Sequence, residues 1–542
     1  MKSKLPSPST LGAPERYSEW RDGQDRALSR VLHSKKRIIV IDAPTGIGKS
    51  LIGVLAGVFP GDRMIYLTAT RGQQDQVEKD FREVGLVDIR GMGNYTCRGL
   101  DEGEFPVEMS QWKATHQHVL ASGGRPKCDD GPCLDGARCS FRAAGAGCHY
   151  YEQYRRAQGA MSVVTNYAFW LHHKAGDDDL GGAAVLVCDE AHELERLISS
   201  FLRIKLDNWE VQEFAHFKWP KPDPGSIGEW SRWAVSLAGF IEGEVSTLGP
   251  GKRRRRLKDV LARVQKLAAA ATDGGRWVSV KTRGGWEWEP IWPAPYVEEH
   301  LFRGIPKIVL MSATIRPKSM ELLGIKKDDY EWVELPSPFP VERRLVSHVE
   351  TVAMRHGMST LQLAEWGMRI DQIIEGRLDR KGIIHTVSYQ RAQELYRESA
   401  HRDIMLVHDS RSTKETIERF KAAEPPMVLV SPAIGTGVDF PFELCEFNVI
   451  GKLAFPDNRD PVMAARQAED KEYPMYLAAC ALVQASGRGM RAADDMCETL
   501  VVDDQIKWFV WKFSHFLPKW WREAYRRGST IPRPPKKINR QS

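Results

Sequence analysis

Short runs of β-branched and aliphatic residues recur along the chain, and each run ends in a polar or glycine-rich turn. The clearest runs are 37–41, 63–67, 184–187, 307–310, 382–385, 427–430, 447–450 and 499–502. Helix-compatible segments separate many of them, and continuous apolar runs are typical of parallel strands that helices cover on both faces. Because the alternation occurs in two blocks, the pattern predicts an α/β protein with two parallel-sheet domains.

Two segments interrupt the first block without continuing its strand pattern. Residues 97–148 are rich in cysteine, and residues 207–285 are rich in tryptophan and basic side chains. Residues 526–542 contain three prolines and no apolar periodicity, which predicts a basic disordered tail. The remaining ranges are 17–96, 149–206 and 286–325 for a first α/β domain and 326–525 for a second.

Length and composition agree with this division. A chain of 542 residues and 61.4 kDa is too long for one ordinary hydrophobic core. Its 42% hydrophobic and 27% charged residues are typical of a globular protein in water. No run of about 18 apolar residues occurs, and residues 1–16 lack the apolar stretch of a signal peptide, so we expect a cytoplasmic protein without a membrane partner. The net charge of +6 permits an anionic partner without identifying one.

The first strand run is followed by a sequence typical of a phosphate-binding loop. It reads Ala43, Pro44, Thr45, Gly46, Ile47, Gly48, Lys49 and Ser50, and an apolar helix-compatible run follows it. Backbone N–H groups of this turn and of the helix N-terminus would bind phosphate oxygens, Lys49 would supply a positive charge, and Ser50 a hydroxyl ligand for Mg²⁺. Ala43 stands where the strict pattern has glycine, and a simple glycine-rich turn is the alternative.

A second candidate follows the strand run 184–187, in the sequence Asp189-Glu190-Ala191-His192. Ligands bind at the carboxyl ends of strands in open α/β sheets. There Asp189 could hold Mg²⁺ through water, and Glu190 could orient the attacking water as general base. His192 could connect the nucleotide site to other groups. The alternative is a surface Asp-Glu pair that caps a helix.

A third candidate lies in the second block and contains Gln484, Arg488 and Arg491. An arginine from a facing domain stabilises the charge that spreads over the γ-phosphate oxygens during phosphoryl transfer. Arg488 and Arg491 are three residues apart and would share one helix face. Arginines on a solvated helix are the alternative. The three motifs in this order indicate an ATP-hydrolysing motor that acts on nucleic acid.

Five further segments extend the pattern. They are Arg21-Asp-Gly-Gln24, Leu67-Thr-Ala-Thr70, Ser312-Ala-Thr314, Pro336-Ser-Pro-Phe-Pro340 and Gly435-Thr-Gly-Val-Asp439-Phe440. With them, the sequence resembles the DEAH-box iron–sulfur helicases of superfamily 2, of the XPD and DinG type. The resemblance covers most of the chain from Tyr17 to Asp504.

This resemblance implies two RecA-like motor domains with ATP and Mg²⁺ between them, a metal-cluster domain at 97–148 and an arch-like insertion at 207–285. It implies an ATP-dependent DNA helicase that moves 5′ to 3′ on single-stranded DNA, unwinds forked DNA and works with protein partners of replication or repair. The residues that the family assigns are Gln24 for reading adenine, Asp439 for the nucleotide site, and Thr70, Arg71 and Asn166 for the DNA path.

Two other functions are also compatible with the sequence. One is an ATP-driven translocase or remodeller of DNA or RNA, with a structural zinc module and without processive unwinding. The other is a non-catalytic nucleic-acid-binding scaffold, against which the intact Lys49, Asp189 and Arg488 argue.

Five of the nine cysteines fall within the first insertion, namely Cys97, Cys128, Cys133, Cys139 and Cys148. In a reducing cytosol such a cluster suggests a metal site rather than disulfides, and thiolates suit zinc and an iron–sulfur cluster equally well. The family resemblance favours a 4Fe-4S cluster with Cys97 and Cys148 as the outer ligands. The two middle ligands would come from the other three cysteines.

The second insertion combines tryptophans with the basic run Lys252 to Arg256. Aromatic side chains beside cationic groups can bind single-stranded nucleic acid. We expect core packing for most of the tryptophans and solvent exposure for the basic run, with DNA contact as the alternative. The tryptophans are Trp219, Trp230, Trp233, Trp277, Trp286, Trp288 and Trp292.

Overall fold

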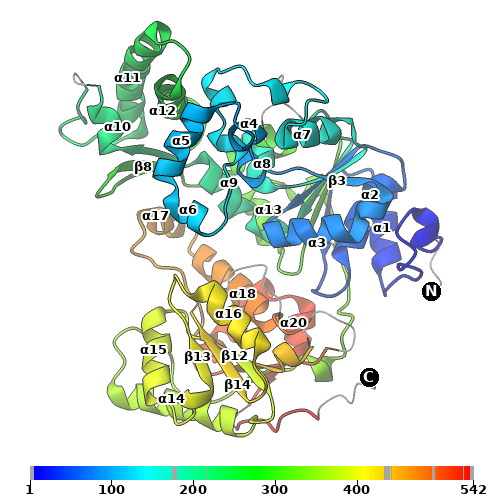
Figure 1. Cartoon of the computed structure of the whole chain (residues 1–542). Coiled ribbons are helices and arrows are strands. Elements are labelled where there is room, and N and C mark those ends of the chain that lie inside the picture. The colour runs from blue at the N-terminus through cyan, green and yellow to red at the C-terminus, as the bar shows by residue number, and fades with distance from the viewer. Residues whose placement is uncertain are drawn as a thin grey trace.

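The computed structural model describes residues 5–173, 180–214, 217–432, 440, 442–490, 495–528 and 530–536. In this part of the chain, two seven-stranded sheets form two α/β domains, and a separate three-stranded sheet supports an insertion (Figure 1). All strand pairs within the two large sheets are parallel. The predicted fold class is therefore confirmed.

The first sheet belongs to motor domain 1. Its strands, in spatial order, are β10 (Tyr330–Glu334), β1 (Ile38–Asp42), β9 (Lys307–Ser312), β5 (Val185–Asp189), β2 (Met64–Thr68), β4 (Ser162–Asn166) and β3 (Leu86–Asp88). Asp42 lies opposite Ser312, and Thr68 lies opposite Asn166. The carboxyl ends of these strands therefore meet at one edge of the sheet, where the candidate motifs begin.

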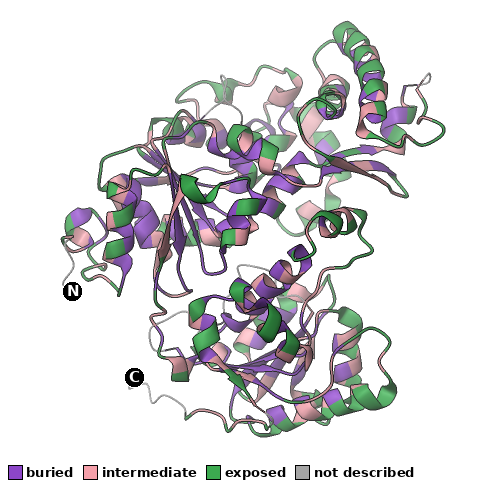
Figure 2. Ribbon diagram, turned by 180° about the vertical axis from the view of Figure 1, so that it is seen from behind, coloured by how far each residue is buried: buried purple, intermediate pink, exposed green. Residues whose placement is uncertain are grey.

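Helices cover both faces of this sheet because its strands alternate apolar side chains between two cores. One core joins Ile39, Ile41 and Tyr66 to α1 (Gln24–His33), α2 (Lys49–Val58) and α3 (Arg71–Phe81). The other joins Val40, Ile65 and Leu67 to α7 (His149–Gly159), α8 (Tyr167–His172), α9 (Leu194–Leu202) and α13 (Pro317–Leu322). Figure 2 shows the strands buried between these layers.

The second sheet belongs to motor domain 2. Its strands, in spatial order, are β13 (Met405–Val407), β14 (Met427–Ser431), β12 (Lys381–His385), β15 (Phe447–Ile450), β16 (Glu498–Val501), β11 (Val346–His348) and β17 (Tyr525–Arg527). One face packs against α14 (Thr360–Glu375) and α15 (Tyr389–Glu398). The other packs against α16 (Thr413–Ala422), α18 (Tyr473–Ser486), α19 (Gln505–Phe513) and α20 (Lys519–Ala524).

The two insertions form separate bodies on motor domain 1. The arch-like insertion contains the antiparallel strands β6 (Ile204–Asp207), β8 (Gly285–Pro290) and β7 (Trp277–Lys281), together with α10 (Asn208–Gln212), α11 (Ile227–Thr247) and α12 (Lys252–Ala269). The cysteine-rich insertion has the short helices α4 (Arg98–Asp101), α5 (Pro106–Thr115) and α6 (Gln117–Ala121). In Figure 1, α11 and α12 project away from the second sheet.

Four predicted boundaries differ from those of the observed elements. The first sheet continues to β10, which pairs with β1, so motor domain 1 extends past 325 to Glu334. β6 and β8 pair with each other in the arch sheet, so this insertion starts before 207 and ends after 285. The predicted disordered tail includes Arg526 and Arg527 of β17, which pairs with β11. Residues 530–536 also pack, since Arg377 and Arg380 donate to the carbonyls of Pro532 and Pro535. Residues 537–542 lie outside the described part.

Candidate active site

The phosphate loop runs from the end of β1 to the start of α2. Gly46 and Gly48 have φ angles of 78° and 82°, in the left-handed region that glycine adopts readily. A Cβ atom at Gly48 would also lie 2.6 Å from Gln24 Nε2. α2 begins at Lys49, so its free N–H groups point toward the loop and can bind phosphate oxygens.

Gln24 supports this loop from behind. Its Nε2 donates to the carbonyls of Ile47, at 2.6 Å, and Gly48, at 3.3 Å, and its Oε1 accepts from Arg21 N–H. Gln24 is buried, whereas Arg21 lines the adjoining cleft and donates to the Gly46 carbonyl. The described geometry thus assigns Gln24 to loop support, and its role in reading adenine stays a prediction.

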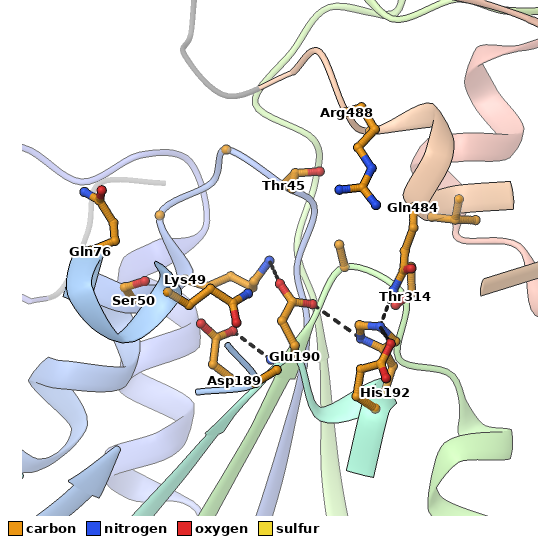
Figure 3. A pocket seen from close by; sticks show the side chains of 18 of the residues that line it. Thr45, Lys49, Ser50, Gln76, Asp189, Glu190, His192, Thr314, Gln484 and Arg488 are labelled. Atoms are coloured by element: carbon orange, nitrogen blue, oxygen red, sulfur yellow. Dashed lines mark hydrogen bonds and ion pairs between the residues drawn. The ribbon is translucent and has the colours of Figure 1, made fainter. Parts of the chain in front are cut away.

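The cleft has a volume of about 510 Å³ and receives residues from both motor domains (Figure 3). Those from motor domain 1 include Thr45, Gly46, Gly48, Lys49, Ser50, Asp189, Glu190, His192 and Thr314. Those from motor domain 2 include Gln484, Gly487, Arg488 and Trp520. The three candidate motifs, far apart in sequence, therefore meet in one cavity.

Asp189 ends β5 and is almost fully buried in this cleft. Tyr66 donates to its Oδ2 at 3.0 Å, and the backbone N–H of Glu190 donates to its Oδ1 at 2.9 Å. Burial, followed by the charge of Glu190, raises the pKa of Asp189 to about 6. The carboxylate is held rigidly beside Ser50, so these two oxygen donors suit a divalent cation that would also offset the buried charge.

Glu190 has a strained backbone, with a φ of 51° that non-glycine residues seldom adopt. This turn places its carboxylate in the cleft, where Oε1 lies 3.9 Å from Lys49 Nζ. Its Oε2 accepts from Ser312 at 3.4 Å and lies 3.3 Å from His192 Nδ1. Glu190 is therefore positioned between the phosphate-loop lysine and the groups that lead to motor domain 2.

His192 makes the direct link between the two domains. Its Nδ1 lies 2.7 Å from Ser312 Oγ, and its Nε2 contacts the side-chain amide of Gln484. Burial opposes a charge on the ring, but hydrogen bonds to Glu190 and Glu193 and their charges raise the pKa of His192 to about 9. The predicted connecting role of His192 thus has a physical route, from Glu190 to Gln484.

Arg488 follows the end of α18 and is largely buried. Figure 3 shows its guanidinium turned into the cleft beside Thr45. Gly487 lets this segment approach closely, since a Cβ atom there would lie 3.2 Å from Thr45 Oγ1. Arg491 and Asp439 lie outside the described residues.

Trp520 is a cleft residue that sequence analysis missed. It lies on α20, and the sequence around it shows only a cluster of aromatic and basic residues without a nucleotide-binding motif. Only the fold brings α20 to the cleft, by packing it against α18.

The predicted DNA-contact residues lie at the carboxyl edge of the first sheet. Thr70 caps α3, because its side chain accepts from Gln73 N–H. Asn166 caps α8, because its Oδ1 accepts from Phe169 N–H at 2.8 Å. Arg71 is exposed. Their role in binding DNA stays a prediction.

The five cysteines of the first insertion line one small cavity together with Met92, Leu134, Phe141 and Tyr151. Cys128 lies near Cys148 and Cys97, whose thiols together with burial raise the pKa of its own thiol. Cys133 and Cys97 lie on the same side, because a Cβ atom at Gly131 would be 3.4 Å and 3.5 Å from their sulfurs. Cys139 instead donates to Glu104 at 3.5 Å. Among the described residues, no three acidic, histidine or cysteine side chains converge as ligands of a single metal ion.

The arch-like insertion buries its tryptophans and pairs its basic run. Trp230 and Trp288 are fully buried, and Trp219, Trp233 and Trp286 pack around them. Arg253 and Arg256 pair with Glu213. Arg255 pairs with Asp135 of the cysteine-rich insertion at 3.2 Å. The expected core packing of these tryptophans is observed, and Lys252, Arg253 and Arg256 are exposed as expected, although Arg253 and Arg256 also form ion pairs.

The sequence of motor domain 2 matches a known domain family. Residues 375–524 match the helicase C-terminal domain family. The whole fold is similar to that of an XPD helicase, with 14% identity, coverage of 93% of this chain and 98% of that one, and a TM-score of 0.56. Residues 375–524 therefore contain a helicase C-terminal domain, and the chain as a whole has an XPD-like fold.

Two further proteins are similar to this chain. The XPD-like fold is shared with Xpd4 of S. tokodaii, at 12% identity, with coverage of 94% of this chain and all of that chain and a TM-score of 0.55. A probable ATP-dependent helicase of Methanocaldococcus jannaschii is 23% identical over 197 residues, which are 34% of this chain and 30% of that protein. The match thus spans less than a third of that relative. The described residues include no helix long and apolar enough to span a membrane.

Proposed function

We propose that this protein hydrolyses ATP to move along single-stranded DNA and to unwind forked duplex DNA, in the 5′ to 3′ direction that the family resemblance implies. One observation carries the proposal. A single cleft holds Lys49, Asp189 and Glu190 from one motor domain and Gln484 and Arg488 from the other. Motors convert such shared sites into domain motion, because the ligand favours the closed arrangement of the two domains.

Each cleft residue has a defined part in the reaction. The N–H groups of the phosphate loop and Lys49 bind the phosphates, while Ser50 and Asp189 hold Mg²⁺, which when bound neutralises phosphate charge. Glu190 accepts the proton of the water that attacks the γ-phosphorus, and ADP leaves as the phosphorus–oxygen bond breaks. Arg488 stabilises the charge that develops on the transferred group.

The hydrolysis site communicates with motor domain 2 through His192. A displacement of Glu190 on phosphate release changes the contacts of Ser312 and His192, and His192 in turn contacts Gln484. Because a packed contact of this kind has discrete arrangements, it transmits the nucleotide state to the second domain.

DNA-stimulated ATPase activity tests the proposal. We expect Lys49→Ala and Glu190→Gln to lower the hydrolysis rate by at least about a hundredfold, since each removes a group that acts in the transition state. Arg459→Ala, on an exposed side chain far from the cleft, is the matched control. A wild-type protein without DNA-stimulated hydrolysis, or a Lys49→Ala variant with full activity, would refute the proposal.

Strand separation defines the substrate and the direction. Duplexes with a 5′ tail, a 3′ tail or an RNA tail should be compared, and we expect unwinding of the 5′-tailed DNA alone. ATP hydrolysis with displacement of a bound protein but no strand separation would favour a translocase. Equal activity on RNA would contradict the preference for DNA.

We also propose a 4Fe-4S cluster held by Cys97, Cys128, Cys133 and Cys148. The support is the shared cavity, the position of Cys128 near Cys148 and Cys97, and the separate hydrogen bond of Cys139 to Glu104. Thiolates suit such a cluster, which would link segments that have few buried apolar side chains of their own. The four thiolates need not converge on one ion, because a cluster spreads its ligands over four iron atoms.

Metal content and single substitutions test this ligand set. We expect anaerobically purified protein to contain about four iron atoms, as the cluster formula requires. Cys133→Ser should lose most of the iron, and Cys139→Ser should retain it. Zinc without iron would overturn the cluster, and loss of iron in Cys139→Ser would overturn the choice of ligands.

A further inference from the structure

The cleft has an aromatic wall that the phosphate chemistry does not use. Among the described residues that line it, Trp520 is the only phenylalanine, tyrosine or tryptophan. It belongs to motor domain 2 and lies on α20, whereas the phosphate loop belongs to motor domain 1. The remaining lining side chains that approach the phosphate loop are mostly polar or small. Trp520 thus offers the largest aromatic surface among the described residues that line the cleft.

Contacts with Arg344 fix the position of Trp520. Arg344 donates to its carbonyl, and the guanidinium lies over the indole, 5.9 Å from the ring centroid. Arg344 is in turn fixed, because its Nε donates to the Phe339 carbonyl at 3.1 Å. The next residue, Trp521, is fully buried and donates to Ser486 at 3.0 Å. These contacts anchor α20 to residues 336–340, which link the two motor domains, and to the segment that carries Arg488.

The indole nitrogen has an unmet hydrogen-bonding requirement. Trp520 Nε1 is buried and has no partner among the described residues. A buried N–H without an acceptor is costly, and such groups in native proteins call for a specific explanation. Because this nitrogen is not accessible from the cleft, a nucleotide there would meet only the exposed part of the Trp520 side chain.

The opposite wall of the cleft carries Arg21. Its guanidinium donates to the Gly46 carbonyl and therefore lies at the top of the phosphate loop. Gly23, two residues further on, adjoins the linker residues Leu335 and Pro336. The linker thus connects the neighbourhood of Arg21 to that of Trp520, on the side of the cleft where the two domains join. A base between these walls would have a planar cation on one face and an indole on the other, and both groups stack on aromatic rings.

We infer that Trp520 is the base-stacking residue of this site, which motor domain 2 contributes to bind the nucleobase of ATP and ADP. This inference rests on the proposed nucleotide site and adds a specific function for α20. Stacking recognises the flat face that all bases share, so Trp520 strengthens binding without selecting adenine. It also gives motor domain 2 a contact with the nucleotide that persists after the γ-phosphate has left.

Binding of two ligands separates base stacking from phosphate binding. ADP and tripolyphosphate, which has no base, should be titrated into the full-length protein by calorimetry. We expect Trp520→Ala to weaken ADP binding by roughly tenfold, the loss typical of one stacked base, and to leave tripolyphosphate binding unchanged. Trp520→Phe should recover most of the ADP affinity. Trp511→Ala is the matched control, because Trp511 lies on α19 of the same domain and is 80% exposed.

The outcomes distinguish this inference from the proposed function. Equal weakening of both ligands by Trp520→Ala would overturn the inference, since it would show a general disturbance of the cleft. Unchanged ADP binding in Trp520→Ala would overturn it as well. Lys49→Ala should weaken both ligands, and if it weakens neither, the nucleotide site itself is wrong. In steady-state ATPase assays, Trp520→Ala should raise KM much more than it lowers kcat.

Discussion

His192 is one of the residues through which the two motor domains contact each other. Its ring is enclosed by Glu190, Glu193, Ser312 and Gln484, which come from both sides of the cleft. Glu193 lies 3.3 Å from its Nε2, and despite the effect of burial, His192 helps to lower the pKa of this carboxyl group to about 2. The protonated ring and its two carboxylates therefore form a buried ionic group whose charge depends on pH.

This group predicts a specific pH dependence of stability. The pKa of His192 is raised above its unfolded value of 6.5 to about 9, so its stabilising contribution is complete below 6.5 and is lost as the pH rises through about 9. We expect the melting temperature of the nucleotide-free wild type to fall across this interval more than that of His192→Gln, which cannot titrate. Parallel curves for the two proteins would contradict a charged His192, and the comparison cancels the titration of other groups such as the cysteines.

Single residues also show what a sequence can reveal about a site. Lys49, Asp189, Glu190 and Arg488 could be predicted because each carries a defined chemistry next to a recognisable strand or helix. Trp520 could not, since nothing in its local sequence states that α20 reaches the cleft. The contacts of Gln24 were equally hidden, because its partners are backbone carbonyls of the phosphate loop, whereas it was expected to read adenine.

At the scale of elements, the missed edge strands β10 and β17 differ in burial from the predicted strands, although the buried strand β4 was missed as well. The predicted runs correspond to β1, β2, β5, β9, β12, β14, β15 and β16, which form most of the two sheet interiors. β10 and β17 lie at sheet edges, and their residues are half-buried or exposed. An edge strand pairs through its backbone on one side only and needs no continuous apolar run. Periodicity therefore could not separate β17 from a tail, or β10 from the start of the second domain.

The arch-like insertion shows the same limit. Its helices α11 and α12 could be expected to lie outside the motor sheet, but β6 and β8 have the apolar residues of ordinary strands. Their assignment depends on pairing, and β8 pairs with β6 and β7 rather than with the large sheet. Partner choice between strands distant in sequence is a tertiary property, which a single sequence does not specify.

At the scale of the whole molecule, a buried ionic contact ties motor domain 2 to motor domain 1 and the arch. Arg466, on α17 (Pro461–Glu469), lies 3.0 Å from Glu195 of α9 and 3.1 Å from Glu289 of β8. It also donates to Ser199 at 2.9 Å and to the Ile291 carbonyl at 2.7 Å. Tyr473 completes the group by donating to Glu195 at 2.8 Å. All three charged residues are buried.

Breaking this contact should be costly. Removal of one partner leaves buried charges without compensation, a loss of about 3–5 kcal/mol. We therefore expect Arg466→Ala to lower the melting temperature clearly, whereas Arg459→Ala, on an ion pair whose arginine is 90% exposed, should leave it unchanged. Scanning calorimetry of both variants provides the measurement. A wild-type melting temperature in Arg466→Ala would show that the contact contributes nothing to holding the domains together.

The Arg466 contact also limits how motor domain 2 can move relative to motor domain 1. Motor domain 2 is joined to motor domain 1 by the covalent linker 336–340 and by the buried ionic group around α17, and it also contacts motor domain 1 through His192 and Gln484 and through α13. If the contacts of His192 and α13 release while the linker and the ionic group hold, the second domain keeps one easy freedom, rotation about the line through these two points. As long as Arg466 stays in place, the nucleotide cycle would therefore turn the second domain about a fixed axis, and the translation of each step would be set by the distance of the bound strand from that axis.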